Sequence, residues 1–180
     1  MTAKLLSFGL QGISGYLVEI EASVSWGLPA LNIVGLPDSV VKESRERVKA
    51  AVKNSGYDWP AERITISLAP SAIRKEGPSF DLGIALSILY ATGQINLLGP
   101  KDFLILGELS LDGTIKPIKG ALPIAMEINK YGYKNLLLPF ENIKEASIIS
   151  GIDCFPVKTL KGAVELLNNP QAKPFKTDIS

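Results

Sequence analysis

The stretch LAPSAIRKEGPSFDLGIALSIL, residues 68–89, passes from a loop through a Gly-Pro turn into an apolar run. Pro78 suits the first position of a helix because its missing N–H is not needed there. Asp81, one turn further, favours the positive end of the helix dipole. This pattern predicts a helix over residues 78–92, with Ser79 in its first turn, where a hydroxyl hydrogen-bonds locally.

Ser79 also has a chemical interpretation. The free N–H groups of such a turn can bind an oxyanion while a serine attacks a carbonyl carbon. The serine then needs a base, and this chain contains no histidine, which excludes a Ser-His-Asp triad, a Cys-His dyad and any histidine zinc site within it. A lysine with a lowered pKa or a carboxylate would have to act instead. Both interpretations of Ser79 stay open from this motif alone.

Upstream of this motif the sequence predicts a hairpin, a further strand, a helix and a fourth strand. Asp38 is expected to cap the helix, whose apolar positions recur at helical spacing and which stops at Gly56. Partial alternation of apolar residues around turn signals indicates that the first two strands form an antiparallel hairpin. The predicted strands cover residues 4–10, 15–26, 30–36 and 63–69.

Downstream, short strands alternate with helices, which is typical of crossover units on a partly parallel sheet. Together with the opening hairpin, this predicts a single-domain α+β fold rather than a doubly wound one. The polar end, residues 169–180, carries two prolines and no periodicity, and is expected to be a linker. The strands are expected over residues 103–109, 113–118, 135–139 and 153–157, and the helices over residues 122–132, 142–147 and 160–169.

The composition limits the classes of function. A chain of 180 residues fits one domain, and 46% hydrophobic and 21% charged residues are ordinary for a globular α+β protein. The formal net charge of +1 provides no overall field toward nucleic acid or an anionic membrane. One cysteine, no signal-peptide pattern and no long apolar run lead us to expect a cytoplasmic protein without membrane contact.

Any contact with nucleic acid would therefore have to be local. A basic stripe recurs along the helix predicted after Asp38, at spacings of three and four, and can follow a phosphate backbone. The alternative is a solvated, ion-paired face, because Glu43 lies four residues before Arg47 and Glu46 lies within the stripe. The stripe is formed by Lys42, Arg45, Lys49 and Lys53, and two loops, if they come together, would add Arg74, Lys75, Lys116 and Lys119.

Three aromatic residues are a second candidate contact with nucleic acid. Trp26, Tyr57 and Trp59 could stack on bases, or they could close an edge of the core. The acidic residues are scattered without the spacing of a metal site, so no metal ligands are expected. Cys154 lies in a predicted apolar strand and is expected to be buried and unreactive.

The stretch quoted above resembles the loop and helix of Lon-type peptidase domains, whose nucleophile lies in a Lys-Asp-Gly-Pro-Ser-Ala-Gly motif, and Ser79 matches that serine. The resemblance continues through LGELSLDGTIKPIKGALPIAMEINKYGYKNLLLPFEN, residues 106–142. In that family the catalytic lysine stands in the helix after a Pro-Ile-Gly-Gly turn, at the position that Ile124 matches here. An isoleucine cannot take a proton from Ser79, so the resemblance implies a degenerate site without a catalytic residue.

A closer resemblance rests on LNIVGLPD, residues 31–38, and on the pattern Lys-Glu-Gly, two residues, Phe-Asp-Leu at residues 75–82. These motifs resemble the N-terminal domain of the ComM/YifB family of magnesium-chelatase-like AAA+ proteins, over residues 4–168. The resemblance implies the ribosomal protein S5 domain 2-like fold that Lon peptidase domains share, followed by an AAA+ ATPase module. Members linked to natural transformation act as hexameric DNA helicases that drive branch migration. Since no Gly-Lys-Ser/Thr occurs here, ATP and Mg are expected in that module and no cofactor in this chain.

The sequence therefore predicts a non-catalytic, Lon-like N-terminal domain over residues 1–168, with residues 169–180 as a linker toward the ATPase. Its expected partners are that ATPase domain, further copies in a homo-hexamer, and single-stranded or branched DNA. One departure from the family favours an alternative, a Ser-based peptidase acting through Ser79. The family commonly has small residues such as Gly-Ser-Gly before Phe-Asp-Leu, whereas Gly77-Pro78-Ser79 is closer to the peptidase motif. A third possibility is a partner-binding module of a chelatase-like ATPase without a DNA role.

Overall fold

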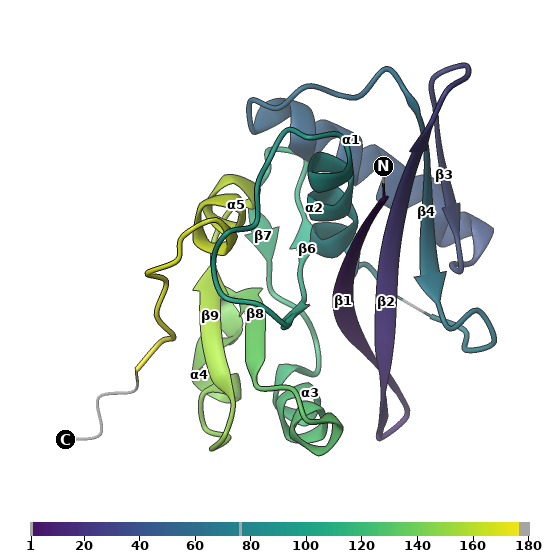
Figure 1. The fold of residues 1–180 in the computed structure, drawn as a ribbon. Helices are drawn as coiled ribbons and strands as arrows, with labels where there is room; N and C mark the ends of the chain where they lie inside the picture. Colours follow the sequence, from purple (N-terminus) through teal and green to yellow (C-terminus); the bar gives the residue numbers. More distant parts are fainter. Residues whose placement is uncertain (1, 76, 177–180) are drawn as a thin grey trace.

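The computed structural model describes residues 2–75 and 77–176. It contains a seven-stranded sheet and a separate two-stranded hairpin, with helices packed against the sheet (Figure 1). The strands are β1 (Thr2–Gln11), β2 (Ser14–Ser25), β3 (Ala30–Val34), β4 (Arg63–Ala69), β5 (Phe103–Ile105), β6 (Glu108–Leu109), β7 (Ile115–Lys116), β8 (Asn135–Pro139) and β9 (Asp153–Val157). The helices are α1 (Asp38–Asn54), α2 (Asp81–Ala91), α3 (Ala121–Ile128), α4 (Ile143–Ala146) and α5 (Leu160–Leu167), with single 3-10 turns η1 (Asn129–Tyr131) and η2 (Phe140–Asn142).

The large sheet has the strand order β3-β4-β2-β1-β5-β8-β9 and is rich in parallel pairs. The pairs β3–β4, β1–β5, β5–β8 and β8–β9 are parallel, whereas β1–β2 and β2–β4 are antiparallel. The predicted hairpin is confirmed, since β1 and β2 pair continuously up to Gln11 and Ser14 at the turn. The protein is thus a mixed α/β single domain with a parallel-rich sheet.

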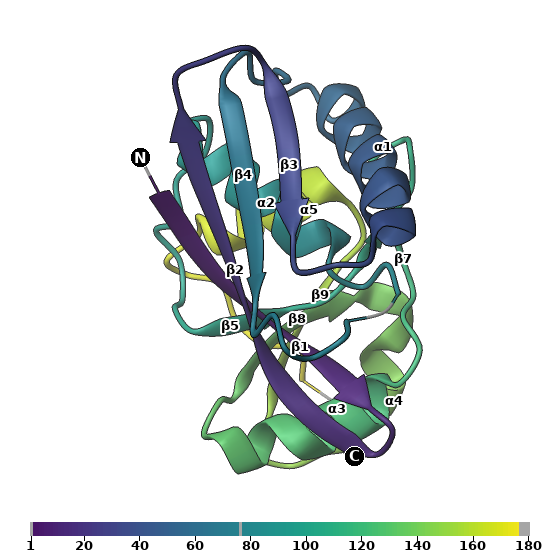
Figure 2. The same ribbon diagram turned by 90° about the vertical axis from the view of Figure 1, so that its right-hand side faces the viewer.

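The parallel strands β5 and β8 lie between two helical layers. Leu137 of β8 joins the larger core with α1, α2 and α5, whereas Leu136 and Leu138 join a second core with α3 and α4. Because successive side chains of a strand point to opposite faces, a strand between two such layers is apolar throughout. By contrast, the outer face of β2, β4 and β3 carries no helix (Figure 2). It bears exposed polar residues such as Glu21 and Ser67, which explains the alternation in these strands.

Helix α2 lies in the centre of the larger core, and its residues from Asp81 to Leu89 are all buried. Gly83 allows the helix to approach β2 closely, because a Cβ at that position would lie 2.6 Å from Ile20 Cδ1. The predicted start of this helix at Pro78 is wrong. Asp81 is its first residue, since the turn that carries Ser79 is bonded to the connection between β5 and β6 instead of continuing the helix.

The predicted elements before and after α2 are present with shifted ends. Asp38 is the first residue of α1 and not its cap; Pro37 occupies the cap position without a side-chain hydrogen bond. Gly56 follows the end of α1 with a positive φ of 89°, as the stop signal predicted. The strand predicted over residues 103–109 is divided into β5, which pairs with β8, and β6, which pairs with β7, because Gly107 between them bonds to Ser79 and Leu82 instead of to a strand.

Residues 169–176, the described part of the predicted linker, lie against the domain. Phe175 N–H donates to Cys154 O at 2.7 Å, and Ala172 packs against the larger core. Cys154 is buried in β9, as predicted. The linker prediction also covers residues 177–180, which lie outside the described residues, and the boundary after residue 168 stays a prediction. In the described part of the chain, no helix has the length and apolarity needed to cross a membrane.

Candidate functional site

The turn that carries Ser79 opens into a cavity of about 530 Å³, which we call the Ser79 pocket. Its wall is mostly apolar, and its polar side chains are the Ser79 hydroxyl, the Tyr16 phenol, the Glu108 carboxylate and the Lys119 ammonium group. A concave apolar cavity with a few convergent polar groups is the usual form of a ligand site. The pocket is lined by Phe8, Gly9, Leu10, Tyr16, Gly77, Pro78, Ser79, Phe80, Glu108, Pro117, Ile118, Lys119 and Ile124.

The backbone of Ser79 is held by the connection between β5 and β6. Gly107 N–H donates to Ser79 O at 2.9 Å, and Leu82 N–H donates to Gly107 O at 3.1 Å. Gly77 begins the turn with a φ of 82°, in the left-handed region that favours glycine. These contacts determine where the Ser79 hydroxyl enters the pocket.

Ile124 of α3 is 4% exposed and lines the same pocket as Ser79. The structure therefore brings together the two positions that the resemblance to Lon-type peptidases matches to the nucleophile and its base. Lys119 and Glu108 also line the pocket, but no hydrogen bond joins either side chain to Ser79 within residues 2–75 and 77–176. The position matched to the base thus contributes only carbon atoms, which accept no proton.

Asn142 fixes the loop that carries Lys119, and the sequence analysis missed this role. Its buried side chain accepts a hydrogen bond from Ile118 N–H and donates one to Ile118 O, both at 2.9 Å. The side-chain amide of Asn142 thus satisfies both backbone groups of Ile118, as the backbone of a neighbouring strand would. The sequence feature that could have indicated this role is the final asparagine of Leu-Pro-Phe-Glu-Asn. Nothing near that motif, however, indicates Ile118 as its partner.

Asp81 is a buried connection between α1, α2 and β6, rather than only a favourable charge at a helix start. Its carboxylate accepts hydrogen bonds from Arg47 Nε at 2.7 Å, Arg47 Nη2 at 3.1 Å, Ser44 Oγ at 2.8 Å and Leu109 N–H at 3.2 Å. Burial raises the pKa of Asp81, and the hydrogen bonds from Arg47 and Ser44 lower it, but the net effect is a raised pKa. The hydrogen bond with Asp81 raises the pKa of Arg47. The predicted Glu43–Arg47 pair is also present, at 3.9 Å.

Lys75 is fully buried, so its predicted place on a basic surface is wrong. Its ammonium group donates to three carbonyl oxygens, those of Pro70, Ile73 (3.1 Å) and Gly35 (3.2 Å). Burial lowers the pKa of Lys75. Lys75 thereby joins the Lys-Glu-Gly motif to the Leu-Asn-Ile-Val-Gly-Leu-Pro-Asp motif. At Gly35, with φ of 101°, a Cβ would lie 2.2 Å from Leu68 O, so this contact favours glycine.

The basic stripe lies on α1, as predicted, with Lys42, Lys49 and Lys53 exposed. Arg45 is half-buried, and its Nε has no hydrogen-bond partner among the described residues. Lys49 Nζ lies 5.9 Å from the centre of the Trp59 ring, a cation–π contact. Arg45, Lys49 and Trp59 line one cavity of about 260 Å³ beside β3. The structure thus joins the stripe to one of the predicted stacking residues.

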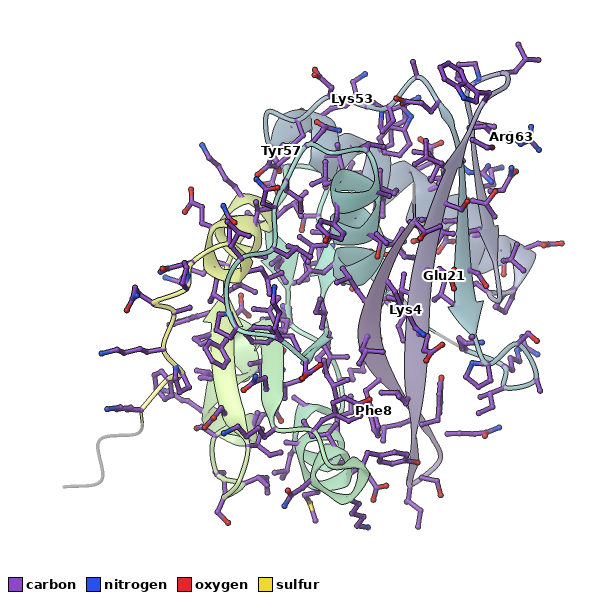
Figure 3. All side chains as sticks on the ribbon, viewed as in Figure 1. Lys4, Phe8, Glu21, Lys53, Tyr57 and Arg63 are labelled. Carbon is purple, nitrogen blue, oxygen red and sulfur yellow. The ribbon has the colours of Figure 1, made fainter. Side chains whose placement is uncertain are left out.

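The other predicted contact residues are dispersed. Trp26 is 99% exposed in the loop between β2 and β3, and Tyr57 is half-buried against the larger core. Lys53 and Arg63, an additional exposed cation, both lie toward the upper end of the molecule in Figure 3. The remaining candidates, Arg74, Lys116 and Lys119, are exposed, and Lys116 and Lys119 line cavities other than the one beside β3. Within the described residues, no group of three acidic or cysteine side chains is arranged to hold a metal ion.

Comparisons with known proteins show which family the chain is similar to. Residues 20–142 match the family model described as subunit ChlI of Mg-chelatase. The chain is 37% identical over 177 residues to competence protein ComM of Haemophilus influenzae, covering 98% of this chain and 35% of that protein. It is 37% identical over 169 residues to the uncharacterized protein YifB of Escherichia coli, covering 93% and 33%. Lon protease 2 of Bacillus subtilis is 31% identical over 188 residues, covering 93% and 33%.

A mixed α/β domain with a Ser79 pocket is therefore related both to chelatase-like ATPases and to Lon proteases. The chain belongs to the magnesium-chelatase-like family that includes ComM and YifB. It spans about a third of the length of these relatives.

Proposed function

We propose that this chain is the non-catalytic, Lon-like N-terminal domain of a ComM-type AAA+ ATPase, with the ribosomal protein S5 domain 2-like fold. The observation that carries the proposal is the apolar Ile124 beside Ser79 in one pocket. The pocket holds Ser79 at the position proposed for the nucleophile, while Ile124, at the position proposed for its base, cannot accept the serine proton. A domain of this kind acts by binding and by organising its neighbours.

The intact protein is proposed to be a cytoplasmic, hexameric DNA helicase that drives branch migration. ATP and Mg would bind in an ATPase module beyond this chain, which spans about a third of the relatives' length. The domain would organise the hexamer or guide DNA to the motor. The measurement is ATP-dependent migration of a branched DNA by the intact protein, with and without residues 1–168. Equal rates for both proteins would contradict a role of the domain in this reaction.

The α1 face is the proposed contact with single-stranded or branched DNA. Three exposed lysines provide charge for phosphates, and the Trp59 ring beside Lys49 provides a surface on which an unpaired base can stack. Lys42→Glu with Lys49→Glu is expected to weaken binding of a labelled single strand about tenfold at low salt and to flatten the salt dependence.

The matched control for this experiment is charge reversal at exposed lysines on other helices, Lys144→Glu with Lys161→Glu. This pair changes the net charge of the chain equally but lies on α4 and α5. If both pairs weakened DNA binding equally, the effect would come from the net charge of the chain, and a specific DNA contact on α1 would be contradicted. The absence of any binding at low salt would assign the DNA contact to another part of the intact protein.

The alternative, a Ser-based peptidase, is favoured by one observation: Lys119 lines the pocket that contains Ser79. If Lys119 served as the base, an unfolded casein substrate would be hydrolysed by the intact protein with ATP, and Ser79→Ala and Lys119→Met would each abolish hydrolysis. No hydrolysis by the unmodified protein would exclude this alternative.

A further inference from the structure

The strand β1 has a free edge beside the Ser79 pocket. It pairs with β2 over its whole length, but with β5 only where Leu6 meets Leu104. Backbone groups of alternate residues point to the same edge of a strand, so Phe8 and Leu10 direct their N–H and C=O groups to the edge that Leu6 offers to β5. No backbone hydrogen bond reaches these groups from a loop or another strand in the described part of the chain. Both residues line the pocket.

The pocket beside this edge suits an apolar side chain. Phe8, Tyr16 and Phe80 contribute rings that are themselves almost fully buried. Two glycines allow this arrangement of the rings: a Cβ at Gly9 would lie 2.5 Å from the Tyr16 ring, and one at Gly15 would lie 2.3 Å from the Phe8 ring. Phe8 also packs edge-on against Tyr131, with ring centres 5.3 Å apart. Tyr131 therefore holds the Phe8 ring in place, and the closely packed rings form the apolar floor of the pocket.

The charges at the pocket favour a ligand with a carboxylate. Lys119 is exposed and forms no ion pair or hydrogen bond through its ammonium group with any described residue. The opposite charge among the described residues that line the pocket, Glu108, is half-buried, whereas Lys119 is exposed. Among the described residues of the pocket, the exposed charge is thus positive, and it lies in the same pocket as the free strand edge.

We propose that the Ser79 pocket binds an extended peptide segment without cleaving it. The segment adds as a strand to the edge of β1 at Phe8 and Leu10, inserts an apolar side chain between Tyr16, Phe80 and Ile124, and places a carboxylate near Lys119. Addition of a strand to an exposed sheet edge supplies affinity through the main chain and specificity through pockets for side chains. The Ser79 hydroxyl can hydrogen-bond to the backbone of the segment. This site is separate from the proposed DNA face on α1.

The test is a selection of random dodecapeptides displayed on phage against the 180-residue chain, followed by fluorescence anisotropy with synthetic, fluorescein-labelled copies of the enriched peptides. Enriched sequences are expected to combine an apolar residue with a nearby acidic residue. Lys119→Glu is expected to weaken their binding at least about fivefold, while Lys144→Glu, a reversal at an exposed lysine of α4, leaves it unchanged. Leu10→Pro, which removes one N–H from the free edge, is expected to weaken it further, with Leu10→Val as its control.

The proposal is overturned if no sequence is enriched, or if the enriched peptides bind Lys119→Glu as tightly as the unmodified chain. Lys119 is exposed, so this variant stays informative even if Leu10→Pro does not fold. The mass of each peptide after incubation separates this proposal from the proposed function. Cleavage with binding would contradict a non-catalytic domain, whereas intact peptide without binding would contradict only the peptide site.

Discussion

Ile124 contributes a branched aliphatic side chain to the wall of the Ser79 pocket, while the backbone that presents Ser79 is held by two hydrogen bonds with Gly107. The backbone contacts that position Ser79 therefore do not depend on whether residue 124 is a base. A single side chain decides which chemistry this pocket supports, because a serine hydroxyl at neutral pH is a weak nucleophile without a base.

Ile124→Lys is therefore expected to make Ser79 reactive toward a fluorophosphonate probe. A lysine in this apolar wall would have a lowered pKa and could accept the serine proton. The measurement is covalent labelling followed by mass spectrometry of the peptide that contains Ser79. Ile124→Met is the control for volume, and Ile124→Lys with Ser79→Ala is the control for the site. Labelling of the unmodified chain at the same rate would mean that another base already serves Ser79.

Lys75 donates to three partly buried carbonyl oxygens of the two loops that follow β3 and β4. Lys75→Met keeps most of the volume of the side chain but leaves these acceptors unpaired. We expect the free energy of unfolding to fall by about 2 kcal/mol, since each buried unsatisfied group costs about 1–3 kcal/mol. Urea unfolding at neutral pH measures this loss. Lys53→Met, at an exposed lysine, is expected to change it by less than about 0.5 kcal/mol.

The same residue predicts a dependence on alkaline pH. Burial lowers the pKa of Lys75 in the folded chain, whereas the unfolded chain keeps its proton up to the ordinary pKa of 10.5. Between these two values the unfolded state binds more protons, so the stability contributed by Lys75 rises with pH and is complete above 10.5. The difference in stability from Lys75→Met should widen as the pH rises toward 10.5 and stay constant above it. A difference that is already constant below pH 10.5 would contradict the pKa assignment.

At the scale of elements, α1 and α2 are joined by a polar contact inside an otherwise apolar interface. Ser44 and Arg47 lie one turn apart on α1, and both donate to Asp81 at the start of α2. Leu109 of β6 donates to the same carboxylate. The contact determines the rotation of both helices, because Asp81 of α2 is buried and accepts hydrogen bonds from two other elements, α1 and β6.

Arg47→Met is expected to lower the free energy of unfolding by about 2 kcal/mol at neutral pH. This value is below the range for a fully buried pair because the Arg47 side chain is 19% exposed. Without the guanidinium, the pKa of buried Asp81 rises further above 3.8, its value in the unfolded chain. Below that pH the carboxyl is protonated in both states, so the loss is small. It grows as pH rises and is complete above the pKa of the folded state.

Urea unfolding of Arg47→Met over about pH 3–8 measures this profile. Glu43→Gln removes the exposed partner of Arg47 at 3.9 Å and is the matched control, with an expected change below about 0.5 kcal/mol. A loss that is equal at all pH values would show that the methylene groups of Arg47, rather than its charge, stabilise the interface.

At the scale of the whole molecule, the described C-terminal residues lie along the edge of the sheet that β9 forms. Phe175 N–H donates to Cys154 O, and Phe175 lines a cavity with Cys154 and Ile152. Burial raises the pKa of Cys154 to about 11, so its thiol is protonated and slow to react at neutral pH. Cys154 can therefore report on the opening of this edge.

Truncation after Asn169 is expected to accelerate labelling of Cys154 by a thiol reagent about tenfold, which corresponds to about 1.4 kcal/mol of local opening. Phe175→Ala in the complete chain should produce part of this effect. The midpoint of global urea unfolding is the control and should change little. An unchanged labelling rate would show that residues 170–180 contribute nothing to this edge, in agreement with the prediction of a free linker.

Much of the fold could be predicted from local patterns. The β1–β2 hairpin, α1, β8 and β9 were expected because their periodicity or apolar runs follow directly from the surfaces they bury. The start of α2 could not be placed, since Pro78 and Ser79 satisfy local rules for a helix start but form a turn bonded to Gly107. The site was predicted in part: Ser79 and Ile124 do share a pocket, whereas Lys75 was placed on the surface.

The sequence by itself determined which side chains are available: no histidine, an isoleucine at the position that the resemblance matches to the Lon lysine, and a basic stripe on one helix. Only the tertiary structure decided which of them meet. Arg47 and Asp81 are 34 residues apart, Ile118 and Asn142 are 24 apart, and Gly35 and Lys75 are 40 apart. Such contacts have no local signal because they depend on how the strands and helices between them pack. Local periodicity specifies the elements, whereas buried polar partners are specified by the completed core.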